Sequence, residues 1–169
     1  MGAHHYKTRL VPRACFGRQL PTTLSESDIE RGLDTTSGWW ALHPPSENFL
    51  SRVRSLLPTA KPWPGGTVEE YVSDVDWGSD VRIWKDAGRV WGISFRFSPV
   101  ADGWSLMQRL LLVARDGQCL LLEESSGALI EPDEGAVRER LASSRAMQFL
   151  RDPKDAILQS AKELNNGAG

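Results

Sequence analysis

The chain has 169 residues, 40% of them hydrophobic, and a formal net charge of -2 at pH 7. This composition predicts one globular core and gives no general reason to expect a nucleic acid or an anionic membrane as partner. The cysteines, Cys15 and Cys119, lie far apart without metal-ligand spacing, so we expect free thiols, no zinc site and no cofactor. An apolar leader and a membrane-spanning run are both missing, which predicts a cytoplasmic protein.

Residues 1–34 begin with a basic stretch that contains no acidic residue up to residue 24. We interpret residues 1–34 as a basic N-terminal arm with a short helix, which Ser25 or Ser27 would cap. The remainder, residues 35–169, is predicted to be a single α+β domain that ends in helices over residues 132–164.

Residues 38–43 are rich in aromatic and apolar side chains and predict a strand, which Pro44 and Pro45 would end. Ser46 is the expected N-cap of a helix, because apolar residues then recur at helical spacing up to residue 57. After a turn-rich connector, residues 68–77 predict a more polar strand.

The clearest pattern is the alternation in residues 81–99, which predicts a β-hairpin with its turn at residues 86–89. Asp102 is the expected N-cap of the helix that follows, and residues 119–124 and 128–131 predict further strands. The second hairpin strand would direct one set of side chains toward the core: Trp91, Ile93, Phe95 and Phe97.

The order of these elements predicts an α+β fold. We expect a two-layer sandwich, ferredoxin-like or related, in which a mainly antiparallel sheet of about five or six strands carries helices on one face. The C-terminal helices would be added to this sandwich.

Two further patterns resemble ligand sites but lack their essential residues. Residues 74–85 begin like a calcium loop, yet Gly78 and Lys85 stand where that loop needs an acidic ligand and a glutamate. Residues 89–97 resemble an RNA-recognition strand, whose aromatic residues lie on an open sheet face. Here the residues that alternate with the aromatics are Val90, Gly92, Ser94 and Arg96. These residues cannot form a core, so the aromatic residues must be the buried ones. We therefore expect neither a metal site nor nucleic-acid binding.

The best candidate site is an acidic block with aromatic neighbours: Glu69, Glu70, Asp74, Asp76, Trp77, Asp80 and Trp84. Charged rims steer association with a partner of opposite charge, and tryptophan serves as a desolvated anchor at interface centres. An alternative interpretation is a solvated acidic edge that discourages strand pairing. Another class of function also stays open, namely a small-molecule-binding protein or small enzyme with His43 and Arg96 in a pocket between sheet and helices.

The segments KPWP, RVWGISFRF, ALIEP and SSRAMQFLRDP, within residues 38–153, resemble small bacterial cytosolic proteins encoded beside secreted toxins. Some of those proteins are cognate immunity proteins, so the resemblance implies neutralisation of a toxin by direct binding. The combined expectation is a non-enzymatic protein-binding module whose partner is a cognate protein such as a basic toxin domain, with no nucleic-acid or membrane partner.

Overall fold

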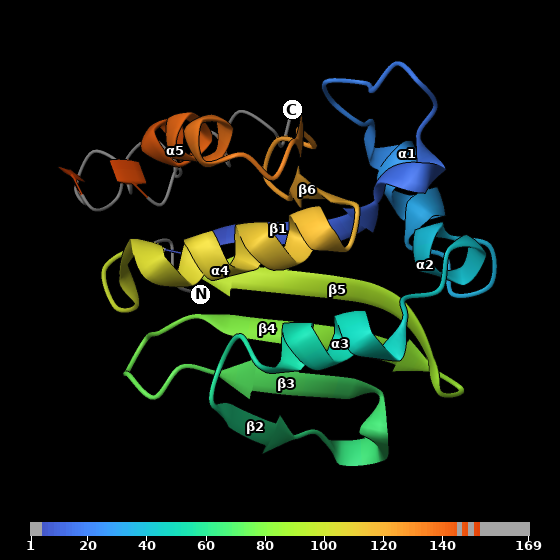
Figure 1. Ribbon diagram of the computed structural model, residues 1–169, viewed down its shortest axis with the longest axis horizontal. Coiled ribbons are helices and arrows are strands. Elements are labelled where there is room, and N and C mark those ends of the chain that lie inside the picture. The colour runs from blue at the N-terminus through green and yellow to red at the C-terminus, as the bar shows by residue number, and fades with distance from the viewer. Residues whose placement is uncertain (1–4, 145–146, 149–150, 153–169) are drawn as a thin grey trace, which may run out of the picture.

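The computed structural model describes residues 5–144, 147–148 and 151–152. Its centre is a seven-stranded antiparallel sheet in the order β2-β3-β4-β5-β1-β6-β7 (Figure 1), which confirms the predicted α+β class with more strands than expected. The strands are β1 (Tyr6–Pro12), β2 (Thr59–Pro62), β3 (Val68–Val72), β4 (Asp80–Asp86), β5 (Arg89–Phe97), β6 (Cys119–Glu123) and β7 (Leu129–Ile130).

Helices α3 and α4 lie across one face of this sheet (Figure 1). The predicted cap of α3 is confirmed, because the Ser46 side chain accepts a hydrogen bond from the backbone N–H of Phe49 at 3.2 Å. The predicted helix beyond residue 152 lies outside the described residues. The α-helices of the described ranges are α1 (Glu26–Gly32), α2 (Trp39–Leu42), α3 (Glu47–Arg54), α4 (Gly103–Asp116) and α5 (Glu134–Ser143), and short 3-10 turns cover Arg13–Cys15 and Pro64–Gly66.

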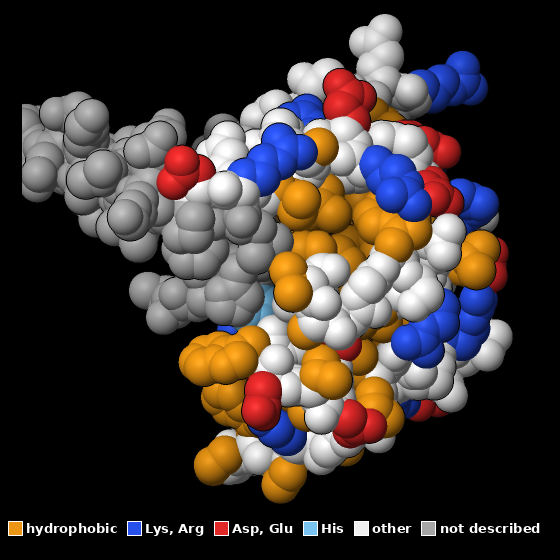
Figure 2. All heavy atoms as spheres, turned by 90° about the vertical axis from the view of Figure 1, so that its left-hand side faces the viewer, with side chains coloured by type: hydrophobic (Ala, Val, Ile, Leu, Met, Phe, Trp, Pro, Cys, Tyr) orange, Lys and Arg blue, Asp and Glu red, His pale blue; other side chains and the backbone are white. Residues whose placement is uncertain are grey.

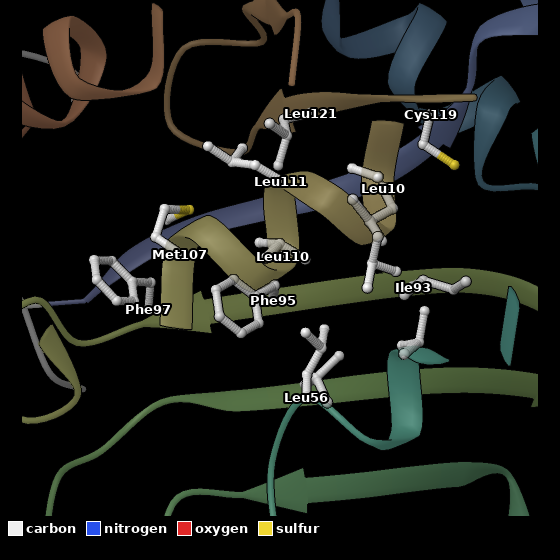
Figure 3. Close-up of a cluster of buried hydrophobic side chains, with 14 of the residues drawn as sticks. Leu10, Leu56, Ile93, Phe95, Phe97, Met107, Leu110, Leu111, Cys119 and Leu121 are labelled. Carbon is white, nitrogen blue, oxygen red and sulfur yellow. The ribbon is translucent and has the colours of Figure 1, made fainter. Parts of the chain in front are cut away.

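The main core lies between the sheet and helices α3 and α4. Phe95 and Phe97 of β5 are fully buried, with their ring centroids 6.2 Å apart. Figure 3 shows them beside Met107 and Leu110 of α4. Burial of side chains of this size stabilises a fold by about 1.5–3 kcal/mol each. The predicted inward face of the hairpin is therefore confirmed for these residues.

Trp91 is the exception to that inward face. The register of β4 and β5 shifts between Trp84 and Lys85, so that Lys85 pairs with Val90, and Val90 is the buried residue. Trp91 packs against Trp84 instead, with ring centroids 5.6 Å apart, on the side of the sheet away from α3 and α4. An irregularity of this kind reverses the direction of neighbouring side chains, which strict alternation does not foresee.

The structure differs from the basic arm predicted for residues 1–34. Strand β1 lies inside the sheet, between β5 and β6. Tyr6 and Leu10 are buried in the main core, and Lys7 and Arg9 alternate with them toward the other face. The period-two alternation was present in the sequence, but the basic residues on the solvated face concealed it.

Residues 38–43 form helix α2 and not the predicted strand. Its single turn sends Trp40 into the main core, where the ring stacks on Phe49 at 5.9 Å and Nε1 donates to the Leu10 carbonyl at 3.0 Å. Trp39 enters a second cluster, in which residues of the 13–33 segment cover the far face of β1 and β6 around Val11. The packing of two large rings on different clusters outweighs the strand propensity of this segment.

Candidate functional site

The predicted acidic block is divided between the two faces of the sheet and one loop. Glu69 points to the helix-covered side of β3, where its carboxylate pairs with Arg54 of α3 (Nε–Oε2 2.8 Å) and with Lys85. The hydrogen bond from Arg54 lowers the pKa of Glu69 to about 2, against the opposing effect of burial. Glu69 therefore fastens α3 to the sheet and does not share a surface with the other candidates.

On the other side of the sheet, the strand register places side chains in rows that cross β2, β3, β4, β5 and β1. One row consists of Lys61, Glu70, Arg82, Ser94 and Arg9, and the next of Asp80, Arg96 and Lys7. Trp84 and Trp91 lie beside these rows. We call these side chains, together with Trp63, the open face.

The carboxylates of the open face are already bound by arginines. Glu70 accepts hydrogen bonds from Arg82 Nε at 2.8 Å and from Trp63 Nε1 at 3.1 Å. Burial raises the pKa of Glu70, but these donors outweigh it and the pKa is lowered overall. Asp80 is only 3% exposed and lies between Arg82 (Nε–Oδ1 3.4 Å) and Arg96, which donates to its Oδ2.

The open face is basic overall, which differs from the acidic surface predicted from the sequence. Its basic side chains are Lys7, Arg9, Lys61, Arg82 and Arg96, whereas Glu70, Asp80 and the Glu124 that pairs with Arg9 are its acids. The mutual pairing of neighbouring strands explains the difference. Glu70 and Asp80 have acidic neighbours in the sequence, but in the sheet they lie opposite Arg82 and Arg96 of adjacent strands.

The tryptophans of the open face are held by polar contacts. Trp84 Nε1 donates a hydrogen bond to Ser94 Oγ at 3.0 Å. The Trp84 ring packs over Gly92, where a Cβ atom would lie 3.5 Å from the ring. The guanidinium of Arg82 lies over the ring of Trp63 at 5.7 Å. These contacts fix the orientation of the side chains and leave the aromatic surface only partly exposed.

The remaining predicted residues lie in the loop between β3 and β4, residues 73–79, which we call the tryptophan loop. Its side chains Asp74, Val75, Asp76 and Trp77 are exposed, and 76% of the surface of Trp77 is accessible to solvent. Val100, in the loop between β5 and α4, is 72% exposed. Figure 2 looks onto this end of the sheet and shows hydrophobic side chains at the surface in its lower half.

Asp102 ties the tryptophan loop to the loop that precedes α4. Its Oδ2 accepts a hydrogen bond from the backbone N–H of Ser79 at 2.6 Å, and its Oδ1 accepts one from Ser73 Oγ. The backbone N–H of Ser98 donates to Ser79 Oγ at 2.9 Å. Asp102 occupies the predicted N-cap position of α4, but its side chain makes no capping hydrogen bond to that helix and binds the tryptophan loop instead.

Trp77 has a left-handed backbone conformation, with φ 59°. His5, which precedes β1, places its Nε2 3.0 Å from the carbonyl oxygen of Trp77 and 3.2 Å from that of Gly78. These contacts hold the backbone of the tryptophan loop at the strained residue. A left-handed conformation costs a non-glycine residue about 1–2 kcal/mol. Strained conformations of this kind cluster at functional sites, which makes Trp77 a candidate site residue.

The residues proposed for an alternative pocket belong to different surfaces. His43 lines a cavity of about 340 Å³ together with Trp40, Asn48 and other residues of the α3 and α4 ends. Arg96 lies on the open face, bound to Asp80. The structure therefore does not combine His43 and Arg96 in one site.

Sequence reasoning missed Asp102, His5 and Val100 as parts of the site. Asp102 contacts residues that are far away in the chain, and no local pattern distinguishes it from a helix cap. The loop itself had a detectable signal, because Ser73, Asp74 and Asp76 are residue types that favour turns, which argued against a strand as far as residue 77.

Within the described ranges, no group of three or more His, Cys, Asp or Glu side chains could hold a metal ion. In the same part of the chain, no helix has the length and apolar character needed to cross a membrane. A scan against protein-family models found no match, and searches of the curated proteins and of the solved structures found none either.

Proposed function

We propose that this chain is a non-enzymatic protein-binding module that docks through the tryptophan loop. From the resemblance of its sequence segments, the proposal extends to an immunity protein that neutralises a cognate toxin in the cytoplasm by direct binding. The observation that carries the docking role is the 76% exposure of Trp77 on a loop that Asp102 and His5 hold in place.

A fixed, exposed tryptophan suits an interface anchor for two reasons. Its side chain offers a large contact area with few rotatable bonds, so little conformational entropy is lost on binding. The loop backbone is already held by Asp102, so the partner need not order it. An anchor of this type contributes about 2–4 kcal/mol to binding.

The acidic neighbours of Trp77 indicate the charge of the partner. Asp74 and Asp76 are exposed on both sides of Val75, and the loop carries no basic residue. Exposed charges of this kind mainly raise the association rate and select against partners of like charge. We therefore propose a partner with a basic surface around an apolar pocket, which is consistent with the toxin domain expected from the sequence.

The cysteines support a binding role over thiol catalysis. Burial raises the pKa of Cys15 to about 11 and that of Cys119 to about 12. Both thiols are therefore protonated at neutral pH, whereas a nucleophilic cysteine reacts as the thiolate.

The test is co-expression of the chain with the product of the neighbouring gene, followed by titration calorimetry of the purified pair. Trp77→Ala should weaken binding by about 30-fold or more, and Asp74→Asn with Asp76→Asn should mainly lower the association rate at low salt. Leu42→Ala is the matched control, because Leu42 is 65% exposed on α2. If Trp77→Ala binds as tightly as the Leu42→Ala control, the tryptophan loop is not the docking element.

A growth assay extends the test to toxin neutralisation. Cells that produce the neighbouring protein should survive only with the wild-type chain or the Leu42→Ala control. Survival with Trp77→Ala at equal protein level would contradict the proposal.

A further inference from the structure

We infer that the open face is a second docking surface, independent of the tryptophan loop, and that it binds an acidic segment of a protein partner. The inference does not depend on the docking role of Trp77. The part of the open face that carries it lies over β4, β5 and β1, around Ser94.

The positive charge of this region is the first step. Arg82 and Arg9 stand on either side of Ser94 in one row, and Arg96 and Lys7 are neighbours in the next row. Adjacent strands are about 4.8 Å apart, so these side chains fit within an area the size of one or two peptide side chains. The acids that the structure describes around them are Glu70, Asp80 and Glu124, and all three are already ion-paired.

The hydrogen-bond donors of the region are the second step. Ser94 Oγ accepts from Trp84 Nε1, so its own proton is directed away from Trp84 and is available to an acceptor. Arg82 binds Glu70 and Asp80 through Nε, while a guanidinium also carries two terminal nitrogens. Arg9 pairs with Glu124 through Nε, and its Nη1 is buried without an acceptor among the described residues, so Arg9 adds positive charge to the region and Nη1 is not one of its accessible donors. A carboxylate matches this set of donors.

The arrangement of the tryptophans favours a peptide over a single-stranded nucleic acid. Bases need flat ring faces on which they can stack. Here Arg82 covers the ring of Trp63, and the rings of Trp84 and Trp91 pack against each other at an angle of 44°. Trp84 and Trp91 are partly exposed, and such side chains suit contact with apolar side chains next to the carboxylates of an acidic peptide.

The probe is a fluorescently labelled peptide in which glutamate alternates with leucine, titrated into the full chain. Lys7→Glu should weaken its binding by about tenfold, because Lys7 is exposed on the open face and the change reverses one charge. Arg109→Glu is the matched control, since Arg109 is exposed on α4, on the other side of the sheet. The indole N–H resonances of Trp84 and Trp91 should shift on binding, and Trp77→Ala should bind the peptide as the wild type does.

Several outcomes would overturn the inference. These are the absence of peptide binding, an equal effect of Arg109→Glu and Lys7→Glu, and unchanged indole resonances of Trp84 and Trp91. Equal binding of a control peptide with glutamine in place of glutamate would exclude recognition of carboxylates. Tighter binding of a single-stranded oligonucleotide would show that the face serves nucleic acid instead. None of these results bears on the calorimetry of Trp77→Ala with the toxin partner, so the two proposals can fail separately.

Discussion

Replacement of Trp77 tests whether the tryptophan loop stores backbone strain. Trp77→Ala and Trp77→Asn remove the same ring, but asparagine tolerates the left-handed conformation better than alanine. The ring is 76% exposed, so its loss removes only about a quarter of the 150–250 Å² that a tryptophan can bury. At about 25 cal/mol per Å² this loss is about 1–1.5 kcal/mol.

The relief of strain opposes that loss in one variant only. We expect Trp77→Ala to lower the free energy of unfolding by about 1–1.5 kcal/mol, and Trp77→Asn to change it by less than about 1 kcal/mol, since the strain is about 1–2 kcal/mol. Urea unfolding followed by fluorescence measures both values. The comparison variant Trp40→Ala should lose about 3–5 kcal/mol, because Trp40 is buried in the main core.

Two results would refute this account of the loop. Equal stability of Trp77→Ala and Trp77→Asn would mean that the backbone of Trp77 is not strained. A loss comparable to that of Trp40→Ala in both variants would mean that the ring of Trp77 is a structural anchor, which would remove the argument that it is retained for docking.

Three further changes test other contacts. Asp102→Ala should destabilise the fold by about 1–3 kcal/mol in urea unfolding, because the Ser79 N–H loses its acceptor. The control Asp116→Ala breaks an exposed ion pair with Arg52 and should cost less than about 1 kcal/mol. Equal losses in the two variants would contradict the anchoring role of Asp102. The pKa of Glu69 is lowered from 4.5 to about 2 in the folded protein, so as the pH falls the unfolded state takes up a proton at this carboxylate before the folded state does. The contribution of Glu69 to stability is about 1 kcal/mol after solvent screening, and it should be lost as the pH falls from about 5 to 2. Glu69→Gln should flatten this part of the stability profile, Glu30→Gln on exposed α1 should not, and identical profiles would refute the assignment. Gly117→Ala should destabilise the fold by about 1–3 kcal/mol, because the new methyl group would lie 2.3 Å from the Phe49 ring. Gly92→Ala should be tolerated, because its methyl group would lie 3.5 Å from Trp84. Thermal unfolding measures both variants, and the reverse order of stability would contradict this packing.

The elements that the sequence predicted well are those whose signal is local. The Ser46 cap and the inward residues Phe95 and Phe97 depend on neighbours within one helix turn or one strand, and the structure confirms them. Trp91 and the segment 38–43 were predicted wrongly, because a register shift and the positions of two separate clusters decide them. Neither can be read from a single stretch of sequence.

The candidate site was predictable in part for the same reason. Trp77, Asp74 and Asp76 lie together because they are close in the chain. Glu69 and Asp80 point away from the loop because of strand alternation, and their charges are compensated by Arg54 of α3 and by Arg96 of β5. A charge block in a sequence predicts a charged surface only where its members share a loop.

The position of β1 has a consequence for the order in which the sheet can assemble. Strands β2 to β5 are sequential neighbours and can pair locally, but Tyr6 pairs with Phe97 and Thr8 with Glu123, far along the chain. During synthesis β1 leaves the ribosome before β5 and β6 and must therefore wait for both of the strands that it pairs with. Contacts of such long sequence separation slow folding. Until β1 is inserted, the edges of β5 and β6 stay unpaired, which makes this step the one most exposed to aggregation.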